Sequence, residues 1–180
     1  LDATYDRAEV ADEDEDTLAG TAHLFRRTDA SLIGGYIGLG EVDSDAFYGA
    51  GVEGELYYTN WTIGGRAGWS SADDTDADGY DVQGRGRYFY GDNTFVQAGV
   101  AFNRVELDQG DDADAWTVGV SGEHQFATTP FSAFAGLSNS DADVVETTAV
   151  TVGVRMNFAT SLKERDRSGA SLASWTRNLF

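Results

Sequence analysis

The sequence predicts an all-β protein, an eight-stranded antiparallel up-and-down β-barrel that spans a membrane, with short N- and C-terminal segments outside the barrel. Three observations predict it. Residues 31–158 alternate apolar and polar side chains with period two, and they hold 20 of the 22 glycines of this 180-residue chain, each of which costs about 1 kcal/mol inside a helix. Tight and long connections alternate along the chain. Aromatic side chains lie near the strand ends, with aliphatic ones between them.

We expect eight strands, at residues 31–41, 46–58, 61–71, 79–90, 94–106, 115–127, 131–139 and 147–158. Three connections are tight, at residues 59–60, 91–93 and 128–130, and four are longer and acidic, at residues 41–45, 71–78, 107–114 and 140–146. Consecutive antiparallel strands reverse direction, so every second connection lies at the same end of the sheet. All long acidic loops should therefore share one end, and all tight turns the other.

The two faces of each strand differ. In residues 61–71, Trp61, Ile63 and Trp69 share one face, whereas Arg66 lies on the other. A soluble lipocalin-like barrel would point the apolar face inward, and a membrane barrel would point it to lipid. Strands mostly of 11–13 residues, aromatic residues at both strand ends and a single lysine in the chain favour the membrane. We therefore expect Trp61, Trp69 and Val152 to face lipid.

Two stretches carry a family resemblance: YGAGVEGELYYTNWTIGGRAGW, at residues 48–69, and VTVGVRMNF, in which alternate apolar residues end at Phe158. They resemble strands of the eight-stranded outer-membrane barrels of the OmpA-like porin superfamily, and the second resembles that family's C-terminal assembly signal. The resemblance implies a mature protein of the bacterial outer membrane, after removal of a signal peptide. One departure is that 22 residues follow Phe158; this tail is either periplasmic or a further strand.

The polar face carries the candidate functional residues. Strand parity places four acids and four bases inside the barrel: Glu53, Glu55, Arg66, Asp81, Arg85, Arg87, Glu123 and Arg155. An eight-stranded barrel is only wide enough for side chains to fill it, and buried charges must pair. We expect a salt-bridge network that closes the lumen; the alternative is a gated or ion-selective pore. A glycosidase would need a cleft that holds a sugar between its two carboxylates, and a filled lumen leaves no such cleft. We therefore expect no catalytic residue and no enzyme.

The two histidines are the remaining candidates for catalytic residues. His124 has lipid-facing parity near a tight turn, whereas the nearest serine, Ser121, lies on the opposite face. His124 and Ser121 therefore cannot form a catalytic dyad within the strand. We expect His124 to have a structural role at the membrane interface. His23 lies in the N-terminal segment, where the sequence indicates no partner for it.

An acidic loop offers a candidate metal site. Residues 74–79, DTDADG, match the first half of a calcium-binding loop, with Asp74, Asp76 and Asp78 as alternate ligands and glycine at the sixth position. The twelfth position holds Arg85, where the motif needs a bidentate Glu. No cofactor is required, and Ca²⁺ or Mg²⁺ at the acidic loops is the candidate. The alternative is a solvated acidic loop that binds ions only diffusely.

Composition and the chain ends complete the expectations. With 31 acids against 12 bases, the net charge of −19 argues against nucleic-acid binding. Residues 1–30 are expected to be a flexible, acidic periplasmic arm, and residues 159–180 a periplasmic tail of opposite charge in which a short helix is possible. The predicted function is a structural or interaction barrel among outer-membrane lipid, with other outer-membrane or periplasmic proteins or further copies as partners. The alternatives are a narrow porin-like channel and a soluble barrel that binds an apolar ligand.

Overall fold

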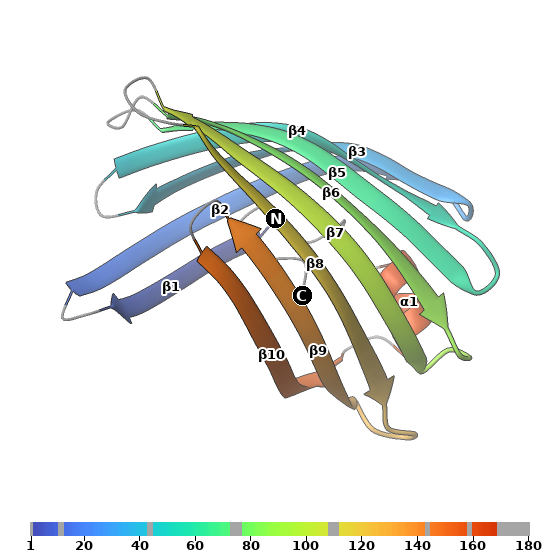
Figure 1. The fold of residues 1–180 in the computed structure, drawn as a ribbon. Coiled ribbons are helices and arrows are strands. Elements are labelled where there is room, and N and C mark those ends of the chain that lie inside the picture. Colours follow the sequence, from blue (N-terminus) through green and yellow to red (C-terminus); the bar gives the residue numbers. More distant parts are fainter. Residues whose placement is uncertain are drawn as a thin grey trace.

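The chain forms one strongly curved antiparallel sheet (Figure 1). The computed structural model describes residues 2–10, 13–42, 45–72, 77–107, 112–142, 145–157 and 160–168. Their elements are β1 (Asp2–Val10), β2 (Glu13–Arg27), β3 (Ser31–Val42), β4 (Asp45–Tyr57), β5 (Trp61–Ala72), β6 (Ala77–Phe89), β7 (Thr94–Leu107), β8 (Ala113–Gln125), β9 (Phe131–Ala142), β10 (Val145–Met156) and α1 (Leu162–Ser168). Each strand pairs with its sequence neighbours, as in an up-and-down barrel.

The eight predicted strands are confirmed as β3–β10, with boundaries shifted by at most a few residues. The prediction of a closed eight-stranded barrel is wrong. Ten strands form the sheet in the described residues, and there β1 pairs only with β2 and β10 only with β9. The sheet therefore curves like a barrel wall but leaves two edges unpaired.

The first thirty residues are not a separate arm, because β1 and β2 belong to the sheet. β2 runs in continuous register with β3, from Thr17 opposite Val42 to Arg27 opposite Leu32. A three-residue turn joins them, closed by the Thr28 amide, which donates to the Ser31 carbonyl at 2.7 Å. The acidic composition of β2 led to the prediction of a flexible arm. Backbone pairing to a neighbouring strand can override such a weak β-propensity.

The long acidic connections are shorter than the sequence indicates, because the strands continue into them. β3 ends at Val42 and β4 begins at Asp45; likewise β9 ends at Ala142 and β10 begins at Val145. Strands of 12–14 residues from β3 to β10 exceed the roughly 9–11 that a bilayer requires. The up-and-down order places these connections at one end of the sheet and the tight turns at the other, as predicted.

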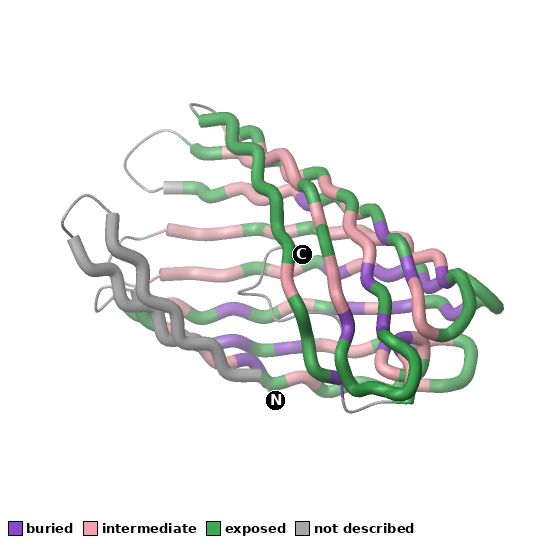
Figure 2. The backbone as a smooth tube through the Cα atoms, turned by 90° about the horizontal axis from the view of Figure 1, so that it is seen from below, coloured by how far each residue is buried: buried purple, intermediate pink, exposed green. Residues whose placement is uncertain are grey.

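Buried and exposed residues alternate along several strands (Figure 2). Because successive side chains of a strand point to opposite faces, the buried residues share the concave face and the exposed apolar ones share the convex face. Trp61, Trp69 and Val152 are 47%, 37% and 74% exposed. The convex face also carries aromatic pairs near both ends of the strands: the ring centroids of Trp61 and Tyr88 are 5.0 Å apart, and those of Phe102 and Trp116 are 4.7 Å apart. This is an apolar outer band with aromatic residues at its rims.

Among the described residues, no helix has the length and hydropathy to cross a membrane.

Candidate functional site: a charged concave face and its helix

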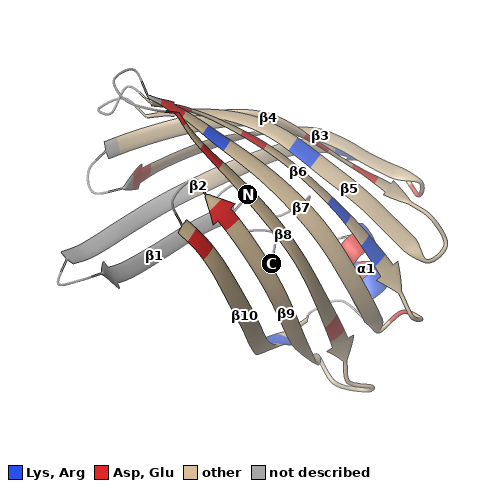
Figure 3. Ribbon diagram, in the orientation of Figure 1, with Lys and Arg blue, Asp and Glu red and all other residues tan. Residues whose placement is uncertain are grey.

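The candidate site is a set of ion pairs on the concave face, from the middle of the strands to the tight-turn end. Strand alternation points every second side chain of β4, β5, β6 and β8 to this face. Glu53, Glu55, Arg66 and Glu123 are thereby buried, each less than 8% exposed. Figure 3 shows acidic positions at the strand ends beside the long connections, whereas the basic positions of β5 and β6 lie along the strands.

One cluster surrounds the ring of Tyr36, which lies across the concave face. The Arg66 Nε donates to Asp81 Oδ2 at 3.1 Å, and the guanidinium carbon lies 5.6 Å from the Tyr36 ring. The His23 ring centroid lies 5.8 Å from that of Tyr36. His23 Nδ1 lies 3.1 Å from Glu53 Oε1, with both side chains at most 4% exposed. Gly51 and Gly68 make this arrangement possible, since a Cβ atom at either position would overlap the Tyr36 ring or hydroxyl.

A second cluster is centred on Glu55. Arg85 NH2 donates to Glu55 Oε1 at 2.6 Å, and the Tyr57 hydroxyl donates to Glu55 Oε2 at 2.7 Å. The Nε of Arg27, from β2, donates to the Tyr57 hydroxyl at 3.1 Å. Both carboxylate oxygens therefore accept a hydrogen bond, which is what a buried carboxylate requires.

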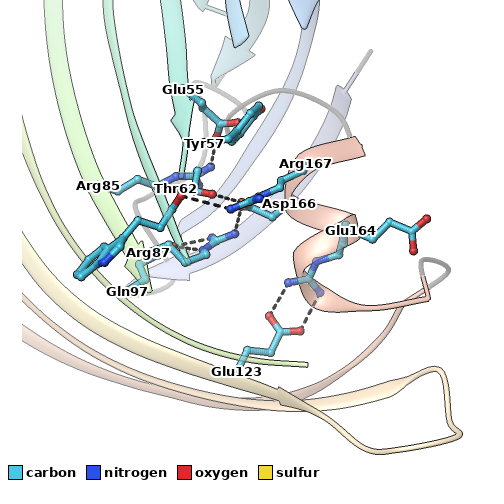
Figure 4. Close-up of polar contacts among 12 residues, drawn as sticks. Glu55, Tyr57, Thr62, Arg85, Arg87, Gln97, Glu123, Glu164, Asp166 and Arg167 are labelled. Atoms are coloured by element: carbon cyan, nitrogen blue, oxygen red, sulfur yellow. Dashed lines mark hydrogen bonds and ion pairs between the residues drawn. The ribbon is translucent and has the colours of Figure 1, made fainter. Parts of the chain in front are cut away.

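The remaining pairs connect the sheet to α1, which lies on the concave side beside the tight turns (Figure 4). Arg87 pairs with Asp166 of the helix, and the Thr62 hydroxyl donates to the same carboxylate at 2.6 Å. Arg87 Nε also donates to Gln97 Oε1 at 3.1 Å, and its guanidinium carbon lies 4.2 Å from the Phe95 ring centroid. A buried arginine is thus satisfied by partners from both the sheet and the helix.

Glu123 receives two arginines. Arg165 of α1 donates through both terminal nitrogens, to Oε1 at 2.8 Å and to Oε2 at 2.7 Å, which is a bidentate pair. Arg155 of β10 donates to Oε2 at 2.7 Å, and the Ser132 hydroxyl donates to Oε1 at 2.5 Å. A single carboxylate therefore joins β8, β9, β10 and the helix.

The helix has its own terminal and apolar contacts. The Ser161 hydroxyl accepts the Glu164 amide at 3.1 Å, and Glu164 Oε2 accepts the Thr160 amide at 2.9 Å, so these side chains satisfy amides at the helix start. Leu162 is fully buried and forms an apolar cluster with Phe89 and Phe95. Because a seven-residue helix is marginal alone, these contacts to the sheet hold it in place.

The two Thr160 hydrogen bonds, from its hydroxyl and its amide, lower the pKa of the exposed Glu164 carboxyl. A lowered pKa in the folded state contributes stability above the usual glutamate pKa, and that contribution disappears as pH falls through the lowered value. We expect Glu164→Gln to lower the melting temperature at neutral pH, with the difference from the parent vanishing on acidification. A difference that stays constant across the same pH series would contradict this expectation.

The structure brings together three pairs from the eight predicted lumen residues: Glu55 with Arg85, Arg66 with Asp81, and Glu123 with Arg155. Glu53 and Arg87 instead find partners outside that set, His23 and Asp166. Period-two parity would have placed His23 inside if residues 13–27 had been interpreted as a strand. No signal in the sequence marks Asp166 and Arg165, beyond the tail's charge being opposite to that of the N-terminal segment.

The other candidate residues lie apart from this network. His124 is exposed, and its Nδ1 lies 2.8 Å from the Thr94 hydroxyl. Asp78 lies in β6 opposite Ser71, whereas Asp74 and Asp76 fall outside the described residues. Within the described ranges, no three His, Asp or Glu side chains are grouped to hold a metal ion.

Comparison with known proteins places the fold among outer-membrane proteins. No protein-family profile and no curated protein sequence matches this chain. A loop L8 deletion mutant of OmpT, an outer-membrane protein of Vibrio cholerae, superposes with a TM-score of 0.63 at 16% identity, over 86% of this chain and 57% of that protein. In-vitro folded OmpT of Vibrio cholerae in its trimer form gives a TM-score of 0.58 at 14% identity, over 82% and 60%. This chain thus spans less than two thirds of these proteins, and its curved antiparallel sheet resembles part of their fold.

Proposed function

We propose that this chain is a membrane-spanning β-barrel protein of the bacterial outer membrane, with a structural or interaction role rather than an enzymatic one. One observation carries the proposal: apolar side chains are exposed on the convex face, while ionisable ones are buried on the concave face. Water would favour the opposite arrangement, since it solvates charges and excludes apolar surface. A lipid environment outside the wall and a filled lumen inside it account for both faces.

The interior network supports a closed lumen. Four ion pairs join strands, or a strand and α1, through side chains that are at most 17% exposed: His23 with Glu53, Arg66 with Asp81, Arg85 with Glu55, and Arg87 with Asp166. Charges held in such pairs stabilise a fixed arrangement of the wall. They are poorly placed to bind or transform a substrate, which supports a non-enzymatic role.

Two surfaces indicate the proposed partners: the convex face, and the long acidic connections at one end of the sheet, which we call the acidic rim. Outer-membrane lipid would cover the apolar band, and the acidic connections would meet solvent or other outer-membrane or periplasmic proteins. Further copies of the chain are also proposed partners, because one fold neighbour is described in a trimer form.

A narrow channel for small solutes or ions is the second candidate. The sheet has ten strands in its described part rather than eight, and barrel diameter grows with strand number. A lumen wider than that of an eight-stranded barrel would leave space between the paired side chains and the opposite wall.

Detergent extraction and bilayer recording test the proposal. The protein should remain with the membrane fraction after salt and carbonate washes and enter solution only with detergent. In planar bilayers we expect small or no conductance. Release by salt washing would contradict the membrane location, and a large, steady, ion-selective conductance would establish the channel instead.

We also propose that Ca²⁺ or Mg²⁺ binds the acidic rim, with Asp74, Asp76 and Asp78 as ligands. Carboxylates spaced closer than the Debye length of about 8 Å repel one another, and hard divalent cations relieve that repulsion. We expect millimolar calcium to raise the melting temperature relative to chelator at equal ionic strength, and Asp76→Asn to reduce the rise. A melting temperature that follows only ionic strength would contradict a specific site.

A further inference from the structure

We propose that α1 is a displaceable plug, held at the tight-turn end of the concave face by two buried charge clusters, and that its release opens a path along this face. The inference rests on the proposed membrane barrel, because only a lumen can be closed by a plug. Figures 1 and 4 show α1 on the concave side, beside the turn between β6 and β7. The Lys163 amide donates to the Asp92 carbonyl of that turn at 3.0 Å.

The contacts that hold α1 are mainly polar. Leu162 is the one apolar side chain of the helix, LKERDRS, and it packs in a cluster with Phe89 and Phe95. Burial of a single leucine is a small apolar contact surface for a docked element. The other contacts include the Arg165 pair to Glu123, the Asp166 contacts to Arg87 and Thr62, and the Lys163 amide to the Asp92 carbonyl. The Arg167 guanidinium donates to the Tyr58 carbonyl and lies over the Tyr57 and Phe89 rings.

Polar contacts of this kind make docking sensitive to the loss of a single partner. Glu123 Oε1 and Oε2 each accept a hydrogen bond from Arg165, and the Glu123 side chain is 2% exposed. Without Arg165, Glu123 keeps Arg155 and Ser132 as partners within the sheet, whereas α1 loses both of its hydrogen bonds to this carboxylate. Undocking α1 would let water reach these groups, whereas the strand pairings of the wall need not change.

Covalent attachment makes release reversible. α1 follows β10 after a short connection, so a released helix stays near its site and its effective concentration there is high. Release breaks side-chain contacts, the Leu162 packing and the backbone hydrogen bond from Lys163 to the turn residue Asp92, so the motion leaves the backbone ladder of the sheet intact. These are the properties of a tethered plug and differ from those of a strand in the wall.

A cysteine reporter tests the docking. The chain has no cysteine, so Leu162→Cys in the full-length protein introduces a single thiol at a position that is fully buried when α1 is docked. We expect slow labelling by a water-soluble maleimide. Adding Arg165→Gln should accelerate labelling by about tenfold or more, because it removes both charge-assisted hydrogen bonds from α1 to Glu123.

Lys163→Gln, added to the same reporter, is the matched control. It removes one positive charge from the same helix, but Lys163 Nζ is 3.6 Å from an Asp92 carboxylate that is 71% exposed. An exposed pair contributes little, so labelling should stay within about twofold of the reporter alone. If Arg165→Gln and Lys163→Gln label at the same rate, charge-held docking is refuted. If Arg165→Gln fails to fold, Arg165→Lys replaces it, because lysine keeps the charge but loses the bidentate geometry. Arg165→Lys is expected to accelerate labelling by a smaller factor. No acceleration would refute charge-held docking.

Planar-bilayer conductance of the same variants, without the cysteine, tests the closure. Arg165→Gln should increase conductance or the fraction of time spent in an open state, and Lys163→Gln should not. Faster labelling without any change in conductance would overturn α1 as a plug. Because labelling is measured in detergent solution, failure of every variant, parent included, to insert into bilayers would refute the membrane barrel itself and leave the docking result standing.

Discussion

Replacing Val120 with arginine is expected to cost about 2–4 kcal/mol of the free energy of unfolding in a lipid or detergent environment. Val120 lies in the middle of β8, 55% exposed on the convex face, in register with Ala98 and Leu137. A guanidinium at this depth would have to leave water for the hydrocarbon core. Urea titration in lipid vesicles, followed by tryptophan fluorescence, measures the cost.

His124→Arg is the matched control for Val120→Arg. It introduces the same side chain on the same face of the same strand, at the tight-turn end where headgroups and water are within reach. There we expect a cost of about 0–1 kcal/mol. Equal costs at the two positions would contradict a lipid-facing convex surface, and so would a Val120→Arg protein as stable as the parent.

Arg85→Ala is expected to destabilise the protein by about 3–5 kcal/mol or to open a leak through the lumen. The substitution leaves Glu55, which is 3% exposed, without its cation, while the Tyr57 hydroxyl remains its single donor. Denaturant unfolding and bilayer conductance measure the two outcomes. Adding Glu55→Gln should restore part of the stability, because a neutral amide is cheaper to bury than an unpaired carboxylate.

Arg104→Ala serves as the control for Arg85→Ala. Arg104 also pairs with carboxylates, Asp112 at 2.6 Å and Glu106 at 3.2 Å, but its side chain is 40% exposed near the long connections. Such a pair is worth about 0–1 kcal/mol. If Arg85→Ala and Arg104→Ala cost the same amount, the concave network does not stabilise the wall.

The direction of the side chains in β3–β10 can be predicted from the order of residues along the chain. Alternation with period two determined which side chains of β3–β10 face outward, since successive Cβ atoms in a strand point to opposite sides. The same parity places Glu55 with Arg85 and Arg66 with Asp81 on one face, where the structure pairs them. These are local properties, because each depends only on neighbours along the chain.

Pairing between strands cannot be derived from local patterns in the same way. The acidic composition of β2 argued against a strand, yet its backbone pairs with β3 along eleven consecutive positions. Its membership in the sheet brought His23 next to Glu53. Strand number and the unpaired edges follow from these long-range hydrogen bonds, which depend on the partner strand as much as on the strand itself.

What the sequence determined by itself is therefore the class of fold, the strand positions from residue 31 onward and the inward or outward direction of their side chains. Only the tertiary structure decided that ten strands join the sheet and that Asp166 and Arg165 of α1 complete the pairs of Arg87 and Glu123. The physical reason is sequence separation. Glu123 and Arg165 lie 42 residues apart, and Arg87 and Asp166 lie 79 apart, so nothing in the local pattern relates them, and only the curvature of the folded sheet brings the helix to them.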